Sequence, residues 1–189
     1  DALQNLNAGA TGNNVAIGTN AGNDLTDGLR NVIIGSIAGD QATTIDDCVI
    51  IGYNAGGNAA MTGHDNVLIG KDAGQEMAAG QANIMIGRDS GQATSSGHSN
   101  VAIGDQALAT NIDGDGQVAI GGKGVTTGSG NTMIGGLTCQ AALTGNSNTV
   151  MGQEAGNDLT SGAGNTCVGA FAGDGITTAA NAVCIGYNV

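Results

Sequence analysis

The chain has 189 residues with 36 Gly, no Pro and no Trp, and its charged fraction of 11% is less than half the roughly 25% of an ordinary soluble domain. Its net charge of -12 makes phosphate backbones and anionic lipid surfaces poor partners, so we expect neither nucleic-acid binding nor membrane insertion. The apolar residues come in short runs, far below the roughly 18 consecutive residues that cross a bilayer.

One phrase, Asn-Val-x-Ile-Gly, recurs along the whole sequence. The steps between its closing glycines are 17 residues, apart from one step of 18 and one of 14. A period near 17 is too short for a helical repeat pair or a propeller blade, but it suits one coil of a β-solenoid. The sequence therefore predicts a single all-β domain over 1–189, a single-stack parallel β-solenoid (left-handed β-roll) of eleven coils. The closing glycines are Gly18, Gly35, Gly52, Gly70, Gly87, Gly104, Gly121, Gly135, Gly152, Gly169 and Gly186.

Each phrase predicts a strand of three residues. The first residue of every strand is β-branched, and the third is Ile in all strands except two, which have Met151 and Val168. Because side chains alternate along a strand, the first and third residues share one face, which we assign to the inside of the coil. The expected strands in chain order are 15–17, 32–34, 49–51, 67–69, 84–86, 101–103, 118–120, 132–134, 149–151, 166–168 and 183–185.

The middle residue of each strand should then point outward, yet it is apolar in every coil. Stacked at about 4.8 Å per coil, these residues would form an apolar stripe roughly 50 Å long. Leaving the stripe in water would forfeit on the order of 1.5 kcal/mol or more for each larger side chain. We therefore expect other copies to cover it in a closed cyclic assembly, a homotrimer. The predicted oligomer interface is Ala16, Ile33, Ile50, Leu68, Met85, Ala102, Ala119, Met133, Val150, Cys167 and Cys184.

Two further features recur around each strand. Asn precedes the strand in eight of the eleven coils, as at Asn83, and stacked amides are expected to bond to one another as a ladder. A small residue followed by Gly comes after the strand, as at Ala73 and Gly74, and predicts a second corner with positive φ. A third element, typified by residues 25–28, closes the coil.

The phrase stands most clearly at 14–18 and 100–104, where it reads Asn-Val-Ala-Ile-Gly. It is similar to the head repeats of trimeric autotransporter adhesins and to repeats in trimeric tail-fibre and spike proteins of viruses. The resemblance implies a trimeric rod that lies outside a cell or on a virion and presents corner loops to a receptor. Adhesin heads have a shorter repeat, which this chain matches only between Gly121 and Gly135, so a fibre relative is favoured over an adhesin head.

Three other functions stay open. Residues 17–22 fit the hexapeptide pattern of left-handed β-helix acyltransferases, but the chain has one such hexapeptide per coil and no loop with a catalytic His. An ice-binding β-solenoid needs a regular Thr array, whereas the residue after the glycine varies from Thr19 through Tyr53 to Lys71. A polymeric extracellular filament would form if rods stacked end to end through unpaired strand edges.

The sequence offers little catalytic chemistry, and we expect neither an enzyme nor a cofactor. Residues 111–116 look like the opening of an EF-hand loop and make Asp113 and Asp115 candidate calcium ligands, but Gly122 stands where a bidentate Glu is required. His64 and His98 occupy equivalent positions two residues before the strand Asn and are expected to be surface corner residues.

The cysteines do not form a recognisable metal motif. Cys167 and Cys184 stand one coil apart in the middle row and are interpreted as small hydrophobic residues. If that row faces a threefold axis, we expect that copies could form disulfides across the axis in an oxidising setting.

Overall fold

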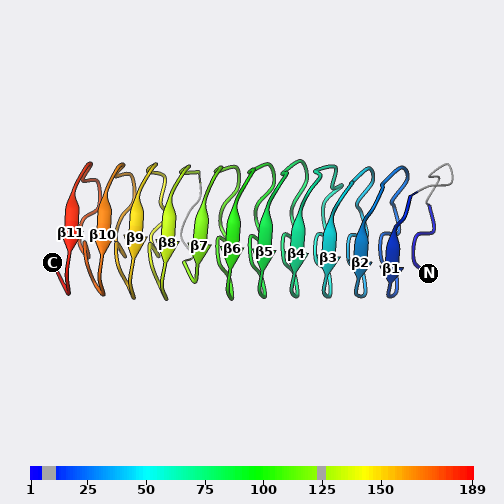
Figure 1. The fold of residues 1–189 in the computed structure, drawn as a ribbon, viewed down its shortest axis with the longest axis horizontal. Coiled ribbons are helices and arrows are strands. Elements are labelled where there is room, and N and C mark those ends of the chain that lie inside the picture. Colours follow the sequence, from blue (N-terminus) through cyan, green and yellow to red (C-terminus); the bar gives the residue numbers. More distant parts are fainter. Residues whose placement is uncertain (6–11, 123–126) are drawn as a thin grey trace.

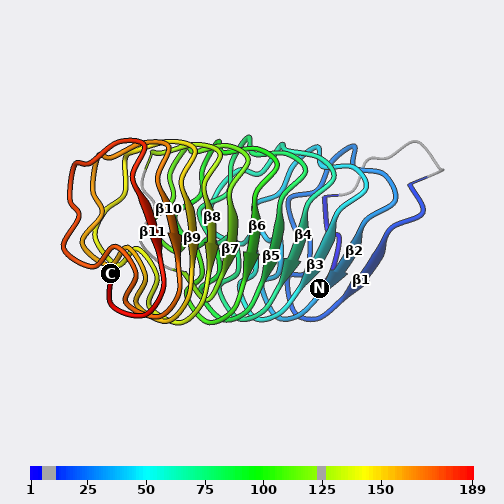
Figure 2. The same cartoon turned by 60° about the vertical axis from the view of Figure 1, so that its left-hand side comes forward.

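Eleven short strands stack along one axis in the computed structural model, which describes residues 1–5, 12–122 and 127–189. They form one parallel sheet whose strand order equals the chain order, so each strand pairs with those just before and after it. Figure 1 shows the strands in a row, and Figure 2 shows the loops that close each coil. The predicted β-solenoid and its strands are confirmed. The strands are β1 (Val15–Ile17), β2 (Val32–Ile34), β3 (Val49–Ile51), β4 (Val67–Ile69), β5 (Ile84–Ile86), β6 (Val101–Ile103), β7 (Val118–Ile120), β8 (Thr132–Ile134), β9 (Thr149–Met151), β10 (Thr166–Val168) and β11 (Val183–Ile185).

The strands keep one register through the whole stack. Val49 lies opposite Val67 although the step between these two coils is 18 residues, and Val118 lies opposite Thr132 across the step of 14 residues. Differences in coil length are therefore absorbed outside the strands, and the sheet is continuous. None of the described segments forms a helix that could cross a membrane.

The glycine after each strand has a positive φ, and after most strands the space between coils also leaves no room for a side chain. Gly70 has a φ of 140°, and a Cβ at this position would lie 2.3 Å from the carbonyl oxygen of Gly87 in the next coil. At the second corner, Gly74 has a φ of 56° and follows Ala73, which is fully buried. The predicted small-residue corner is therefore confirmed as a tight turn.

The core of the solenoid contains the middle residues of the strands. In β2 to β10 these side chains are fully buried, and in β1 and β11 they are partly buried. Larger apolar side chains from the third element, such as Leu25, Met77 and Leu159, are also fully buried. The first and third residues of the strands lie outside, and in β1 Val15 is 46% exposed and Ile17 is 59% exposed.

The predicted assignment of the strand rows to the two faces is therefore wrong. The first and third rows face outward, and the middle row packs inside a single chain, so it cannot be the surface through which copies meet. The residues that belong to the core of the chain, and not to an oligomer interface, are Ala16, Ile33, Ile50, Leu68, Met85, Ala102, Ala119, Met133, Val150, Cys167 and Cys184.

The residue before the strand explains this correction. Asn83, which precedes β5, is fully buried, so its side chain lies inside the coil. Since side chains alternate along a strand, Met85, two positions further on, must point to the same inner side. The buried asparagine thus fixes which rows of the strand face the core.

Candidate functional site

A ladder of buried amides runs along the inside of the solenoid. The backbone N–H of Asn83 donates to Asn66 Oδ1 at 3.0 Å, and Asn83 Oδ1 accepts the backbone N–H of Asn100 at 3.0 Å. Asn83 Nδ2 donates to the carbonyl oxygen of Gly97 in the following coil at 2.9 Å. The predicted amide ladder is confirmed, and each amide ties its coil to the next one twice. The same contacts are made by Asn14, Asn31, Asn131, Asn148 and Asn165.

Two other residue types stand in this ladder. The backbone N–H of Cys48 donates to Asn31 Oδ1 at 2.9 Å, but its thiol makes only weak contacts, with the carbonyl oxygen of Asp46 at 3.3 Å and with that of Gly63 at 3.6 Å. Burial raises the pKa of the Cys48 thiol to about 11, so the thiol is protonated at neutral pH. Gln117, in contrast, preserves the ladder, because its Oε1 accepts the backbone N–H of Asn131 at 3.1 Å. The amide ladder is therefore interrupted at Cys48.

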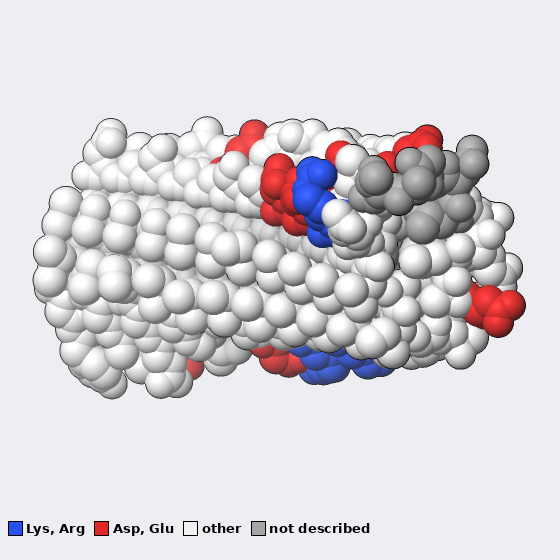
Figure 3. All heavy atoms as spheres, turned by 45° about the vertical axis from the view of Figure 1, so that its right-hand side comes forward, with Lys and Arg blue, Asp and Glu red and all other residues white. Residues whose placement is uncertain are grey.

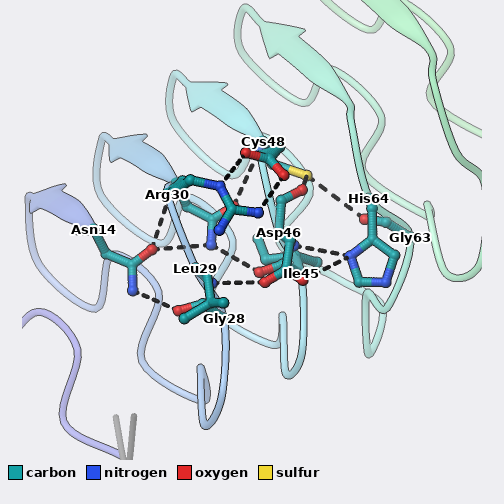
Figure 4. A network of polar contacts seen from close by, with 11 residues as sticks. Asn14, Gly28, Leu29, Arg30, Ile45, Asp46, Cys48, Gly63 and His64 are labelled. Atoms are coloured by element: carbon teal, nitrogen blue, oxygen red, sulfur yellow. Dashed lines mark hydrogen bonds and ion pairs between the residues drawn. The ribbon is translucent and has the colours of Figure 1, made fainter. Parts of the chain in front are cut away.

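A second ladder lies on the outer corner, two residues before the first. Here each polar side chain accepts a backbone N–H from the preceding coil. Asp46 Oδ1 accepts the N–H of Leu29 at 2.7 Å, and His64 Nδ1 accepts the N–H of Asp46 at 2.9 Å (Figure 4). His98 Nδ1 accepts the N–H of Gln81 at 3.1 Å. The ladder continues through Asp115, Ser129 and Asn146.

This outer ladder was not predicted, although the sequence carries a signal for it. Polar acceptors recur at one position of successive coils, but they are chemically varied, so the column does not stand out as the asparagines do. The ladder gives the two histidines a structural contact, and both lie at the surface corner as predicted.

The candidate calcium ligands are not assembled into a site. Asp115 Oδ1 accepts the backbone N–H of His98 at 2.6 Å and so belongs to the outer ladder, while Asp113 is exposed. Within the described ranges, no group of three or more His, Cys, Asp or Glu side chains is placed to hold a metal ion. The same part of the chain forms no pocket.

Ion pairs connect neighbouring coils on the surface. Arg30 donates to both carboxylate oxygens of Asp47 at 2.6 Å, and Arg88 donates to both oxygens of Asp105 at 2.8 Å. The hydrogen bond from Arg30 lowers the pKa of Asp47. All four side chains are about half exposed, so solvent screens these pairs and they contribute little to stability.

The most extensive surface feature is the outer face, by which we mean the first and third rows of the sheet. It is continuous because the register is kept, and it stays partly exposed even in the middle of the stack, where Ile84 is 38%, Ile103 36% and Ile120 41% exposed. In Figure 3, charged side chains gather in a few small clusters, and most of the visible surface carries none. The outer face consists of Val15, Val32, Val49, Val67, Ile84, Val101, Val118, Thr132, Thr149, Thr166 and Val183 in the first row, and Ile17, Ile34, Ile51, Ile69, Ile86, Ile103, Ile120, Ile134, Met151, Val168 and Ile185 in the third.

Comparison of the chain with family models, with curated proteins and with solved structures finds no match. The features of the chain that bear on its function are the outer face and the two ladders that join the coils.

Proposed function

We propose that this chain is a segment of a stiff homotrimeric fibre on a cell surface or virion, a structural and attachment module that catalyses no reaction. Three copies pack through the outer face, and the corner loops remain available to a receptor. The observation that carries the proposal is the continuous outer face, which is apolar except for Thr132, Thr149 and Thr166. The similarity of the repeated phrase to those of trimeric adhesin heads and viral tail fibres also supports it.

The free energy available from the outer face is large enough for assembly. Fully burying an aliphatic side chain contributes about 1.5–3 kcal/mol, so covering the two-fifths of Ile120 that is still exposed would contribute about 1 kcal/mol. Summed along two rows, the outer face offers on the order of 10–20 kcal/mol per copy. Association costs about 4–15 kcal/mol, so the gain is of the size that assembly requires. A closed cyclic arrangement lets every copy bury the same face.

The repeated hydrogen bonding supports a role as a stiff spacer. Strand pairing joins every coil to the next. The inner amide ladder also joins most of the coils, and the outer ladder joins some of them. At about 4.8 Å per coil, the stack is roughly 50 Å long. A rod of this kind holds whatever its corners contact at a fixed distance from its base.

An ice-binding surface is the second candidate, and the regularity of the outer face favours it. The irregular row that argued against ice binding follows the glycine and is not part of this face. The first row is β-branched in all eleven strands and includes Thr132, Thr149 and Thr166. This candidate requires the face to be open to water, so it predicts a monomer that shows thermal hysteresis.

Two substitutions in the third row test the fibre proposal. We expect the double variant Ile69→Asp with Ile103→Asp to remain folded, because both side chains point away from the core and lie on strands that are not direct neighbours. We expect it to sediment as a monomer where the native chain is a trimer. Circular dichroism checks the fold, and Thr19→Asp, at an exposed site beside the sheet, is the matched control. A double variant that keeps the mass of the native assembly would contradict the proposal.

A further inference from the structure

Three of the four cysteines lie in the part of the solenoid from β8 to β11. Cys139 and Cys167 are fully buried, and Cys184 is partly buried against the same core. Cys48 lies far away in the stack, directly before β3. The thiols that could meet within one chain are therefore those of Cys139, Cys167 and Cys184.

Cys167 and Cys184 are direct neighbours across the sheet. Strands β10 and β11 are adjacent in the stack (Figure 1). Cys167 is the middle residue of β10 and pairs in register with Cys184, the middle residue of β11, so both side chains point inward from neighbouring strands. Neighbouring strands are about 4.8 Å apart. This spacing falls within the roughly 4.4–6.8 Å between Cα atoms that a disulfide spans.

The two side chains share the same inner side of the sheet. Cys167 is fully buried, and Cys184 packs against the same core from the next strand. Burial raises the pKa of Cys167 to about 11, and the neighbouring Cys184 adds to the increase.

Cys139 is a poorer partner for either thiol. It occupies the corner position that is glycine in most coils. Its backbone N–H donates to the carbonyl oxygen of Ala155, which is the same contact that Gly22 makes with the carbonyl oxygen of Ala38. In the middle row, Val150 of β9 stands on the side of Cys167 opposite to Cys184. Burial raises the pKa of the Cys139 thiol to about 12, and the neighbouring Cys167 adds to the increase.

We propose that Cys167 and Cys184 form an intrachain disulfide that joins β10 to β11 when the folded chain meets a small-molecule disulfide such as oxidised glutathione. The thiolate of Cys184, the more accessible of the two, attacks one glutathione sulfur, forms a mixed disulfide and releases one glutathione thiolate. The thiolate of Cys167 then attacks the Cys184 sulfur and releases the second glutathione. Two cysteine thiols lose two protons and two electrons, and one oxidised glutathione is reduced to two thiols.

This inference does not depend on the proposed fibre function, since both sulfurs belong to one chain. It replaces the expectation that these cysteines bridge copies across a threefold axis, because Cys167 is fully buried in its own core.

The aspartates of the chain allow a direct test. The folded protein is incubated with oxidised glutathione, then unfolded, alkylated and cut with a protease that cleaves before Asp. Cys139, Cys167 and Cys184 then fall on separate peptides, 115–157, 158–173 and 174–189. We expect mass spectrometry to find 158–173 linked to 174–189, with two of the four cysteines alkylated, and we expect reduction to separate the peptides.

Two variants and one control complete the test. Cys184→Ser should leave the three remaining cysteines alkylated, whereas Cys48→Asn should form the link in the same yield as the native chain. A non-reducing gel of the oxidised protein should show no covalent dimer. Four alkylated cysteines, a glutathione adduct alone, a link that includes Cys139, or a link between chains would each overturn the proposal.

Discussion

Replacing Cys48 by Asn should stabilise the protein, because it closes the gap in the inner amide ladder. In the regular coils, the asparagine Oδ1 accepts the backbone N–H of the next ladder residue, and its Nδ2 donates to a carbonyl three residues earlier in that next coil. At Cys48 these partners are the N–H of Asn66 and the carbonyl oxygen of Gly63. The thiol already lies 3.6 Å from this carbonyl, so the longer amide side chain reaches it.

The size of the effect follows from replacing the weak contacts of the thiol with two amide hydrogen bonds. A buried hydrogen bond contributes about 0.5–1.5 kcal/mol, so Cys48→Asn should raise the free energy of unfolding by about 1–2 kcal/mol. For a chain of this length, this corresponds to an increase in Tm of roughly 2–4 °C per kcal/mol. Urea denaturation followed by circular dichroism measures the change, provided that the transition is two-state.

The reverse substitution at a regular position is the matched control. Asn83→Cys removes the acceptor of the Asn100 N–H and the donor to the Gly97 carbonyl, and it leaves both groups buried without these partners. We expect it to lower the free energy of unfolding by about 2–4 kcal/mol. If Cys48→Asn is neutral or destabilising while Asn83→Cys is tolerated, the ladder is not a main source of stability and the reasoning fails.

Four further substitutions test other parts of the structure by the same denaturation assay. Burial raises the pKa of Asp40, so the charged carboxylate is disfavoured in the folded chain. Asp40→Asn should therefore raise the free energy of unfolding at pH 7. This gain in stability should vanish below the ordinary pKa of 3.8, where the carboxyl is protonated in both the folded and the unfolded state. Gly70→Ala should cost more than about 3 kcal/mol, because of its positive φ and the close carbonyl of the next coil. Gly136→Ala should change stability by less than about 1 kcal/mol, because a Cβ there meets nothing within 4 Å. Arg88→Gln should leave Tm unchanged within error, and a clear loss would show that the surface ion pairs matter more than their exposure indicates.

The repeat made the fold predictable. An apolar phrase of constant spacing predicts one strand per coil, and the register follows because each strand has a single equivalent in the next coil. The glycines and asparagines were also predictable, because their backbone conformation and amide bonding are local properties.

The direction of the side chains was not predictable from the strand alone. In a phrase such as Val49-Ile50-Ile51, all three residues are apolar, so alternation permits either face to be the core. The sequence contained the deciding signal in the residue before the strand, since the buried ladder asparagine shares its face with the middle residue. Because asparagine is common at exposed corners, its burial became clear only from the structure.

The direct test of the proposed assembly is the mass of the native chain in solution. Sedimentation equilibrium at several dilute concentrations should give three times the chain mass of 18.2 kDa if the outer face is buried between copies. A single-chain mass at every concentration, with the circular dichroism of an intact sheet, would contradict the account and leave the outer face open to water.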